Sequence, residues 1–510
     1  MQITGGILLY SPLTTVGELS HKDALSWSNH TIHYSPLTTH YSLLTTHHSP
    51  LTTNCPNHMP DLLFTPFQIR NLHFKNRIVR SSIGGRTSFY DGTITSAFKN
   101  FEKRFAEHEV SGIISATISV NHHRTSPMEY PRLSDDRYIR PLASAIKAVQ
   151  TYDCRYIIQI GDTGGATHTS LFAQDADARS SSTLFDLFYG YHNWHKRMTH
   201  EQIQVTIQEF ASAARRVRET GADGVEITAS KGYVIQQFLN PGINRRRDEY
   251  GGSRDNRLRL LEEIIRAARQ EVGDDFPIGI RLSSADYNYL PLNLRLPPRF
   301  PLKHWYFGNT LEDNLYYARK LKALGIDYLH IDKGYGFPNP KGNPGTFPIP
   351  EMKMFYNSNR HLSVKAWWRA VLFNAIPDFI LHPIGNIGWG YVPAVSADEA
   401  KKFKEVTGLP VISNGGYQDR DIMEQTLQEG KADMLAMARP LLANVNLLQQ
   451  FKQGRNTPAN PCSHCNRCIV RTANFPLGCY DQSRFNSQEE MEEQIMQWSA
   501  TSDEVEEVRE

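Results

Sequence analysis

The sequence predicts a (β/α)₈ TIM barrel, and three observations lead to this class. From Pro60 onward, eight short apolar runs alternate with eight longer amphipathic stretches. The short runs are compact and apolar, which is typical of parallel strands covered on both faces. Several of the longer stretches are followed by glycine, the residue that commonly ends a helix. Eight strand–helix units match the number that closes a barrel, and an open doubly wound sheet is the main alternative.

The expected elements follow one another in chain order. Strands are expected at Arg77–Ile83, Gly112–Ile118, Tyr156–Gly161, Gly224–Thr228, Ile278–Leu282, Tyr328–Asp332, Pro410–Ser413 and Asp433–Ala436. Helices are expected at Ala97–Glu109, Tyr138–Thr151, His200–Glu219, Arg254–Glu271, Leu311–Leu324, Ala397–Val406, Asp421–Glu429 and Leu441–Phe451. The glycines expected to end helices are Gly221, Gly273, Gly325 and Gly430.

The segments outside this rhythm divide the chain into further parts. Residues 1–58 contain three tandem copies of a seven-residue unit (HYSPLTT, HYSLLTT, HHSPLTT) and offer little to bury, so a disordered tail is expected, with metal binding by its histidines as the weaker alternative. The barrel is assigned to residues 59–455, a four-cysteine extension to 456–486, and an acidic tail, either a solvated helix or a frayed end, to 487–510. Two long irregular stretches, Asn288–Asn309 and Gly334–Val395, follow strands and are expected to form lids or substrate walls.

Composition excludes several classes of protein. The 55 Lys and Arg residues nearly balance the 53 Asp and Glu residues, so neither nucleic acid nor an anionic membrane is an expected partner. The most apolar stretch, Val371–Leu381, is interrupted by Pro377 and Asp378 and is shorter than the roughly 20 residues of a spanning helix. Met1–Leu9 lacks the basic start of a secretory signal, so a cytoplasmic location without disulfides is expected.

Two loops predict an anion site at the mouth of the barrel. The seventh strand runs into Asn414, Gly415 and Gly416, and the eighth into Ala438 and Arg439. In a barrel these loops are neighbours at the C-terminal face, where exposed amides and a guanidinium bind phosphate. A simple turn and a surface ion pair are the alternative interpretation.

Two polar side chains near strand ends suit the pyrimidine edge of a flavin. Gln159 lies near the end of the third strand and Arg281 near the end of the fifth. An amide donates and accepts hydrogen bonds, and a cation stabilises charge that develops on the reduced ring. Taken singly, each is more often a structural hydrogen-bonding residue.

Together with these features, longer motifs resemble the Old Yellow Enzyme, or NADH:flavin oxidoreductase, family. The resemblance spans roughly residues 60 to 485, and its most specific part follows the fourth strand. It implies a barrel that holds FMN non-covalently at its mouth. The motifs are Asn76–Val79 (NRIV), Tyr90–Thr93 (YDGT), Gln159, Gly221–Ile227 (GADGVEI), Gly232–Tyr233, Gln237–Pro241 (QFLNP), Asn244–Ser253 (NRRRDEYGGS), Asn256–Arg257, the glycines after the seventh strand and Met437–Pro440 (MARP).

The resemblance also implies residue roles. Tyr233 matches the tyrosine that protonates the substrate carbon opposite the hydride, and a phenol with an ordinary pKa of about 10 keeps its proton at neutral pH. The implied FMN contacts are Ser82, Ile83, Gly84, Thr117, Gln159, Arg281, Asn414, Gly415, Gly416, Ala438 and Arg439.

The sequence departs from the family where the substrate is held. Members carry a His–x–x–His or His–x–x–Asn pair, and the matching positions here are Thr228 and Lys231. A hydroxyl and an ammonium can still donate hydrogen bonds to a substrate oxygen. The segment Val225–Tyr233 resembles the 2,4-dienoyl-CoA reductase branch more closely. That branch also uses a histidine after the sixth strand, and the corresponding loop here, Lys333–Phe337, lacks one.

Four cysteines after the barrel predict a metal site. Cys462, Cys465, Cys468 and Cys479 supply four thiolates, enough for a tetrahedral ion or a cubane cluster. Their spacing is similar to that of the [4Fe–4S] segment of dienoyl-CoA reductases and trimethylamine dehydrogenase, so a [4Fe–4S] cluster is expected, with structural zinc, then no metal, as alternatives. Cys55 and Cys154 are expected bystanders. The branch's FAD and NAD(P) domains are not expected, because no Gly-x-Gly-x-x-Gly segment follows a strand.

The expected function is NAD(P)H-dependent reduction of an activated C=C bond in a small unsaturated substrate. Hydride comes from N5 of FMN and the proton from Tyr233 or water, while Thr228 and Lys231 hold the electron-withdrawing group. Alternatives are an FMN and iron–sulfur dehydrogenase, a lyase with Lys231 as a Schiff base, and a non-catalytic flavin-binding protein. A homo-oligomer and a separate electron-transfer partner are both compatible with the sequence.

Overall fold

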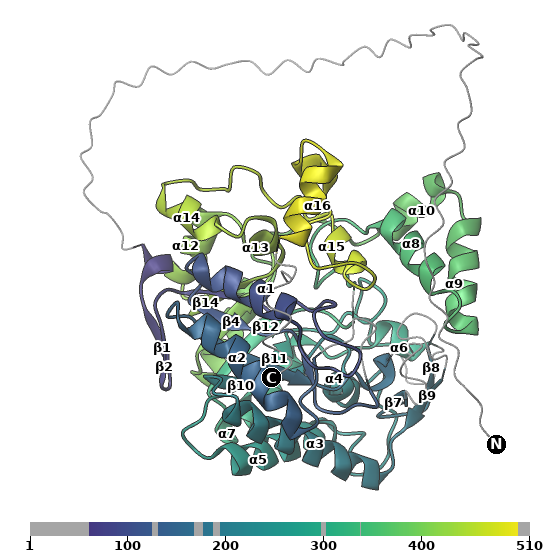
Figure 1. Ribbon diagram of the computed structural model, residues 1–510. Helices are drawn as coiled ribbons and strands as arrows, with labels where there is room; N and C mark the ends of the chain where they lie inside the picture. The colour runs from purple at the N-terminus through teal and green to yellow at the C-terminus, as the bar shows by residue number, and fades with distance from the viewer. Residues whose placement is uncertain are drawn as a thin grey trace, which may run out of the picture. The chain divides into compact units, whose positions relative to one another are not determined.

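Eight parallel strands form a closed barrel in the computed structural model, which describes residues 61–124, 131–167, 177–186, 194–296, 302–336 and 338–497 (Figure 1). The ring closes because β10 pairs with both β6 and β11. This closure confirms the predicted barrel and excludes an open doubly wound sheet. The predicted tail, residues 1–58, lies outside the described residues. The barrel strands are β3 (Ile78–Arg80), β4 (Gly112–Ile114), β6 (Arg155–Gly161), β10 (Gly224–Ala229), β11 (Ile278–Ser283), β12 (Tyr328–Asp332), β13 (Val411–Asn414) and β14 (Met434–Met437).

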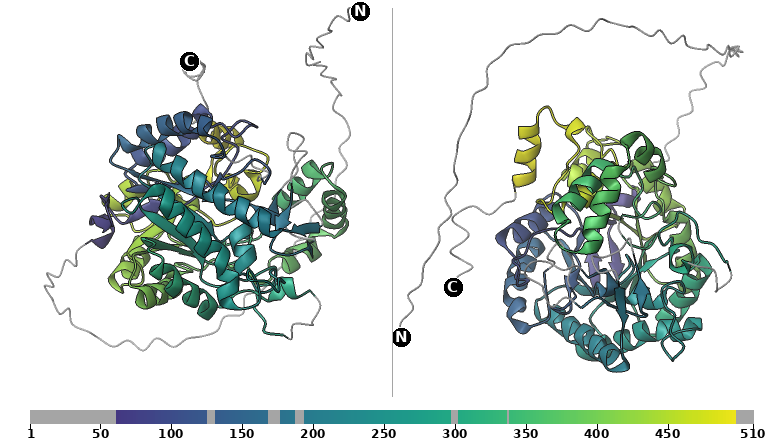
Figure 2. Two further views of the ribbon diagram at one scale, coloured as in Figure 1. Left: turned by 90° about the horizontal axis from the view of Figure 1, so that it is seen from below. Right: turned by 90° about the vertical axis from the view of Figure 1, so that its right-hand side faces the viewer.

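Helices surround the strands, as the right-hand view of Figure 2 shows. The four glycines predicted to end helices all have positive φ, between 64° and 80°. This is the left-handed conformation that glycine adopts without a steric penalty. The surrounding helices are α1 (Ser96–Glu107), α2 (Ile139–Gln150), α3 (His200–Glu219), α5 (Arg254–Val272), α7 (Leu311–Ala323), α11 (Ala397–Thr407), α12 (Arg420–Gln428), α13 (Arg439–Ala443) and α14 (Leu447–Lys452).

Two predicted elements are each divided in the structure. The helix predicted at Leu441–Phe451 is split into α13 and α14, because the backbone leaves the helical conformation at Asn444. Asparagine competes for backbone hydrogen bonds and so favours helix ends. The strand predicted at Gly112–Ile118 is β4 followed, after a gap, by β5 (Ile118–Ser119).

Side chains fill the interior of the barrel, and a two-stranded hairpin closes one of its ends. The hairpin strands β1 (Phe67–Ile69) and β2 (Leu72–Phe74) add their apolar residues to an inner layer that includes Tyr328. Gly279 is needed beside this layer, since a Cβ there would lie 1.9 Å from the Tyr328 ring. The hydroxyl of this ring donates a hydrogen bond to the buried carboxylate of Glu226.

The long segment between β12 and α11 is more ordered than predicted. It contains α8 (Ile349–Asn359), α9 (Val364–Ala375) and α10 (Asp378–Gly385), of which the sequence indicated one. In Figure 1 these helices lie beside the C-terminal extension, and α8 contacts α15 (Arg467–Arg471) of that extension. Short elements complete the fold: β7 (Arg179–Ser180), β8 (Leu184–Phe185), β9 (Trp194–Arg197), α4 (Val234–Leu239) and α6 (Lys303–Tyr306).

The acidic segment predicted as a tail begins with a docked helix. α16 (Gln488–Met496) buries Met491 and Ile495 against Tyr480 of the cysteine extension. Its exposed face carries the glutamates, so the amphipathic pattern explains both the charge and the docking. Among the described residues, no helix is long and apolar enough to cross a membrane.

Candidate functional site at the barrel mouth

The loops after β13 and β14 present unpaired backbone amides. Gly415 and Gly416 have φ values of 112° and 79°, and the Gly415 carbonyl accepts a hydrogen bond of 3.1 Å from the Val395 amide. The amide groups of Gly415, Gly416, Ala438 and Arg439 donate to none of the described residues. Unpaired donors of this kind on adjacent strands are what an anion site requires, and the predicted phosphate site stays a prediction.

Arg439 connects this loop to the cysteine extension. Its Nη1 donates to the Pro344 carbonyl at 2.8 Å and also to Asn466 Oδ1. Asn466 in turn donates to the Thr346 carbonyl at 3.0 Å. One nitrogen of the Arg439 guanidinium therefore donates to protein acceptors. The prediction that Arg439 pairs with a phosphate did not include these contacts.

Gln159 is held in one orientation inside the barrel. Its Oε1 accepts a hydrogen bond from Thr117 Oγ1 at 2.6 Å, and its Nε2 donates to Glu226 Oε1 at 2.6 Å. Glu226, which lies opposite Gln159 in the β10–β6 register, also contacts His330 Nδ1 at 3.1 Å and accepts from the Tyr328 hydroxyl at 3.2 Å. The amide retains one donor and one acceptor for a ligand, as a pyrimidine edge requires.

Glu226 is a buried carboxylate that keeps its charge. Burial alone would raise its pKa, but His330, Arg281 and the Gln159 hydrogen bond outweigh burial and hold the pKa below its ordinary value. Sequence reasoning missed both Glu226 and His330. One signal in the sequence could have revealed them. Each is a polar, ionisable residue in the middle of an otherwise apolar strand.

A second buried group joins Lys231, Asp332 and Arg281. Asp332 Oδ2 lies 3.0 Å from Lys231 Nζ and accepts a hydrogen bond of 2.8 Å from Arg281 Nε. Burial lowers the pKa of Lys231 against the opposing effect of Asp332. Burial would raise the pKa of Asp332, but the two cations outweigh it and lower that pKa. Lys231, predicted to hold the substrate, is paired in the structure with Asp332, the last residue of β12, which sequence reasoning did not select.

Tyr233, Thr228 and Thr117 converge at one point of the mouth. A Cβ built on Gly161 would lie 2.8 Å from Thr117 Cγ2, 2.9 Å from Thr228 Cγ2 and 3.5 Å from Tyr233 Cδ2. Tyr233 stands immediately before α4 and is buried. Two predicted catalytic residues and one predicted FMN contact are thus brought together.

The turn that carries Tyr233 is tied to a buried aspartate. Gln236 Oε1 accepts from the Gly232 amide at 2.6 Å, and Gln236 Nε2 donates to Asp286 Oδ1 at 2.7 Å. Asp286 also accepts from the side chains of Asn240 and Asn309, at 3.0 and 2.9 Å. Burial raises the pKa of Asp286 to about 6 despite these hydrogen bonds.

The remaining predicted FMN contacts also lie at strand ends. Ser82, Ile83 and Gly84 follow β3 and are half-buried, and Asn414 is the last residue of β13. Gly85, the next residue after Gly84, lies against Leu477 of the cysteine extension.

All four predicted metal ligands line one cavity. Cys462, Cys465, Cys468 and Cys479 face it together with Arg439. Among the described residues these cysteines are free thiols, and no three of their sulfur atoms lie within 4.8 Å of one another. A tetrahedral zinc ion, with zinc–sulfur distances of about 2.3 Å, would hold the sulfurs closer than this.

Burial and a nearby guanidinium act in opposite directions on the cysteines of this cavity. Burial raises the pKa of Cys462 to about 11 and also raises the pKa of Cys465 and Cys468, so free thiols keep their protons at neutral pH. Arg484 Nη1 lies 3.0 Å from Cys479 Sγ. Thiolates at these positions would need the positive charge of a bound metal, and four cysteines around one cavity are a donor set that fits a metal centre.

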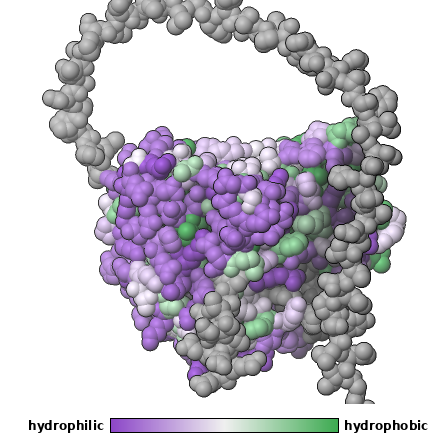
Figure 3. Space-filling model, turned by 45° about the horizontal axis from the view of Figure 1, so that its top comes forward, coloured by the Kyte–Doolittle hydropathy of each residue, from purple (hydrophilic) through white to green (hydrophobic). Residues whose placement is uncertain are grey.

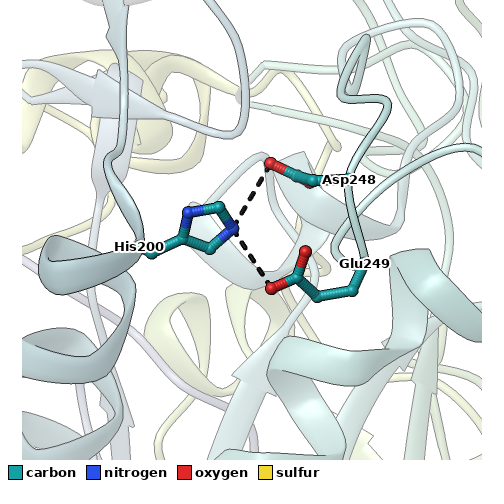
Figure 4. Close-up of side chains that lie close together, drawn as sticks. All are labelled: His200, Asp248 and Glu249. Atoms are coloured by element: carbon teal, nitrogen blue, oxygen red, sulfur yellow. Dashed lines mark ion pairs between the residues drawn. The ribbon is translucent and has the colours of Figure 1, made fainter.

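A second group of ligand-type side chains is an ion-pair network. His200 Nε2 lies 3.6 Å from Asp248 Oδ2 and 3.2 Å from Glu249 Oε1 (Figure 4). Asp248 already accepts hydrogen bonds from Arg246 at 2.7 and 2.9 Å and from Arg197 at 2.7 Å. These guanidinium groups use the carboxylate, so we assign no metal to this cluster.

Comparison with solved structures agrees with the fold. A 2-naphthoyl-CoA reductase complex has a TM-score of 0.65 at 22% identity, over 82% of this chain and 56% of that one. An Old Yellow Enzyme homologue from Zymomonas mobilis has a TM-score of 0.59 at 18% identity, over 81% of this chain and 99% of that one.

Sequence comparison identifies the family. The chain is 26% identical to an NADH oxidase of Thermoanaerobacter brockii over 80% of this chain and 53% of the relative, so it spans about half that relative's length. It is 32% identical to an NADPH dehydrogenase of a Geobacillus species over 55% of this chain and 75% of the relative. The model of the NADH:flavin oxidoreductase / NADH oxidase family matches residues 62–290 and 389–458, which is more than half of the sequence. The chain therefore belongs to the NADH:flavin oxidoreductase / NADH oxidase family.

Proposed function

We propose that the chain is an FMN-dependent oxidoreductase that uses NAD(P)H to reduce an activated C=C bond in a small unsaturated substrate. The observation that carries the proposal is the pairing of four unpaired amides with an amide side chain, Gln159, held in a single orientation at the same mouth. The amides fit the phosphate of FMN and Gln159 fits its pyrimidine edge. When bound, FMN supplies a hydride from N5 to the β-carbon of the substrate.

The chain's own residues then bind, orient and protonate the substrate. Tyr233 holds a proton on its phenolic oxygen, and Thr228 beside it offers a hydroxyl to the electron-withdrawing group. Lys231 and Arg281 share the single carboxylate of Asp332, so these three groups together carry a net positive charge, part of which offsets the buried carboxylate of Glu226. That charge stabilises negative charge developing on a substrate oxygen. The role of Lys231 is therefore electrostatic and depends on Asp332.

We also propose that the four cysteines hold a [4Fe–4S] cluster within an extension formed by residues 456–486. The sulfur atoms lie farther apart than a single zinc ion requires, and Arg439 and Arg484 offset the charge of an anionic cluster. When bound, the cluster would supply one-electron transfer, and Arg439 with Asn466 links the cysteine loop to the glycine loop that would hold the phosphate. The barrel accordingly corresponds to residues 59–455.

The test uses the whole chain purified without oxygen. Prompt bleaching of the flavin by NADH or NADPH, followed by reoxidation with an α,β-unsaturated ketone or acid, is the expected result. Bleaching only by an amine or another reduced organic substrate would indicate a dehydrogenase, as one relative is an N,N-dimethylglycine/sarcosine dehydrogenase. Metal analysis of the same sample separates iron from zinc.

A further inference from the structure

Helix α9 turns a charged side chain toward the protein and its large apolar side chains toward the outside. It buries Lys365, which is 3% exposed, together with Ala366 and Ala370. Its large apolar residues lie on the outside: Trp367, Trp368 and Leu372 are 47%, 53% and 56% exposed. A surface helix normally buries its apolar side and exposes its charges. The outer side of α9 therefore lacks the cover that its side chains require.

The exposed apolar surface continues onto neighbouring elements. In and after α10, Phe379, Ile384 and Ile387 are 78%, 59% and 63% exposed. Gly388 then lies against Pro291, so the loop that carries the exposed Leu292 adjoins the same surface. Figure 3 shows hydrophobic residues in green on the right-hand side, the side of α9 and α10 in Figure 1. We call the exposed apolar residues of 364–387 the α9–α10 face.

The size of the α9–α10 face is that of a protein interface. Taking about 200 Å² for a large apolar side chain, its exposed fractions sum to on the order of 1,000 Å². The largest patch on an ordinary monomer is about 300–600 Å². A stable protein–protein interface uses about 800 Å² on each partner, so this face alone is large enough for one.

Charge around the face favours a protein partner over a lipid surface. From Val371 to Val392 the one charged residue at neutral pH is Asp378, and it is paired with Lys353 at 2.5 Å. Arg369 of α9 is half-buried and lies over the Tyr356 ring at 5.8 Å. Helices that lie on membranes carry several lysines and arginines beside the apolar stripe, whereas α9 has two, of which Lys365 is buried and Arg369 is half-buried over the Tyr356 ring. Depletion of charge with enrichment of aromatic residues is the composition of an interface core.

We propose that the α9–α10 face pairs with the same face of a second copy of this chain. An apolar face with few charges is complementary to itself, which a two-fold symmetric contact requires. The family match leaves out residues 291–388, which include α9 and α10, so the proposed contact lies outside the residues that the family model matches. The proposal does not rest on the proposed function.

The experiment is sedimentation of the whole chain from about 0.1 to about 100 µM, a range that covers interfaces of this area. We expect a species of twice the chain mass of 58.1 kDa. Phe379→Glu and Leu372→Glu should each weaken dimerisation about a hundredfold, because each would bury an unpaired charge. Val205→Glu, which places the same charge at a 52% exposed position on α3, is the matched control and should remain dimeric.

Three outcomes would overturn the proposal. The first is a single-chain mass at every concentration. The second is a dimer that both glutamate variants preserve, since it would use another face. The third is flotation of a monomeric chain with vesicles of phosphatidylcholine and phosphatidylserine that Phe379→Glu abolishes, which would assign the face to a membrane surface. Unchanged circular dichroism of the variants shows that they fold.

Discussion

Replacing Glu226 by Gln should release the side chain of Gln159 and weaken FMN binding. The Glu226 carboxylate is fully buried and accepts hydrogen bonds from Gln159 at 2.6 Å and from the Tyr328 hydroxyl at 3.2 Å, with His330 Nδ1 at 3.1 Å. The side chain of glutamine has the same shape as that of glutamate, but an NH₂ group replaces one of the two acceptor oxygens. This NH₂ group would face the groups that donate to the carboxylate in the wild type. The amide of Gln159 is then no longer fixed toward the mouth.

The expected magnitude follows from the hydrogen bonds lost. A hydrogen bond to a charged group is worth about 1.5–3 kcal/mol, so we expect Glu226→Gln to lower the free energy of unfolding by about 3 kcal/mol. Loss of one oriented contact to FMN, about 1.4 kcal/mol, weakens FMN binding about tenfold. Urea unfolding measures the first quantity, and quenching of flavin fluorescence on titration measures the second.

Tyr328→Phe is the matched control for this experiment. It removes the hydroxyl that donates to the other oxygen of the same carboxylate and leaves Gln159 untouched. We expect it to cost about 1 kcal/mol of stability with no change in FMN affinity. The reasoning is refuted if Glu226→Gln binds FMN as wild type does, or if Tyr328→Phe weakens FMN equally.

Three further predictions concern the proton donor, a buried carboxyl and the metal site. Tyr233→Phe should slow alkene reduction by about 10²–10⁴-fold while flavin reduction by NAD(P)H stays unchanged in stopped flow; equal turnover would contradict its role. The folded state raises the pKa of Asp286 to about 6, so it holds this proton more tightly than the unfolded chain does. The stability from this group is therefore full below about pH 4 and lost as pH rises through 6, about 3 kcal/mol in all. Urea unfolding should show that this slope is missing in Asp286→Asn, and a slope like that of wild type would be inconsistent with it. Cys462→Ser should lose iron by metal analysis whereas Cys154→Ser keeps it, and equal iron in both would exclude the site.

The local pattern of the sequence was sufficient for the barrel and part of its mouth. Eight apolar runs and the glycines after helices are local features, and the structure reproduces them within a few residues. Gln159 and Arg281 could be selected because polar residues near the ends of buried strands are conspicuous. The glycines at 415 and 416 could be selected because the loop proposed to hold phosphate is contiguous in sequence.

The partners of these residues could not be predicted from local pattern. Glu226 and His330 are separated by 104 positions and meet only through strand register inside the barrel. Asp332 is the end of an apolar run, and nothing in its neighbourhood shows that it binds both Lys231 and Arg281. The helix α10 was missed because it has only eight residues and contains Pro383, a residue that normally ends a helix.

The absorbance spectrum of the purified chain on titration with FMN tests the central claim most directly. If the barrel mouth is a flavin site, the protein binds one FMN per chain and shows the bands of a protein-bound oxidised flavin. A folded protein that stays colourless and leaves the spectrum of added FMN unchanged would contradict the assignment of the mouth.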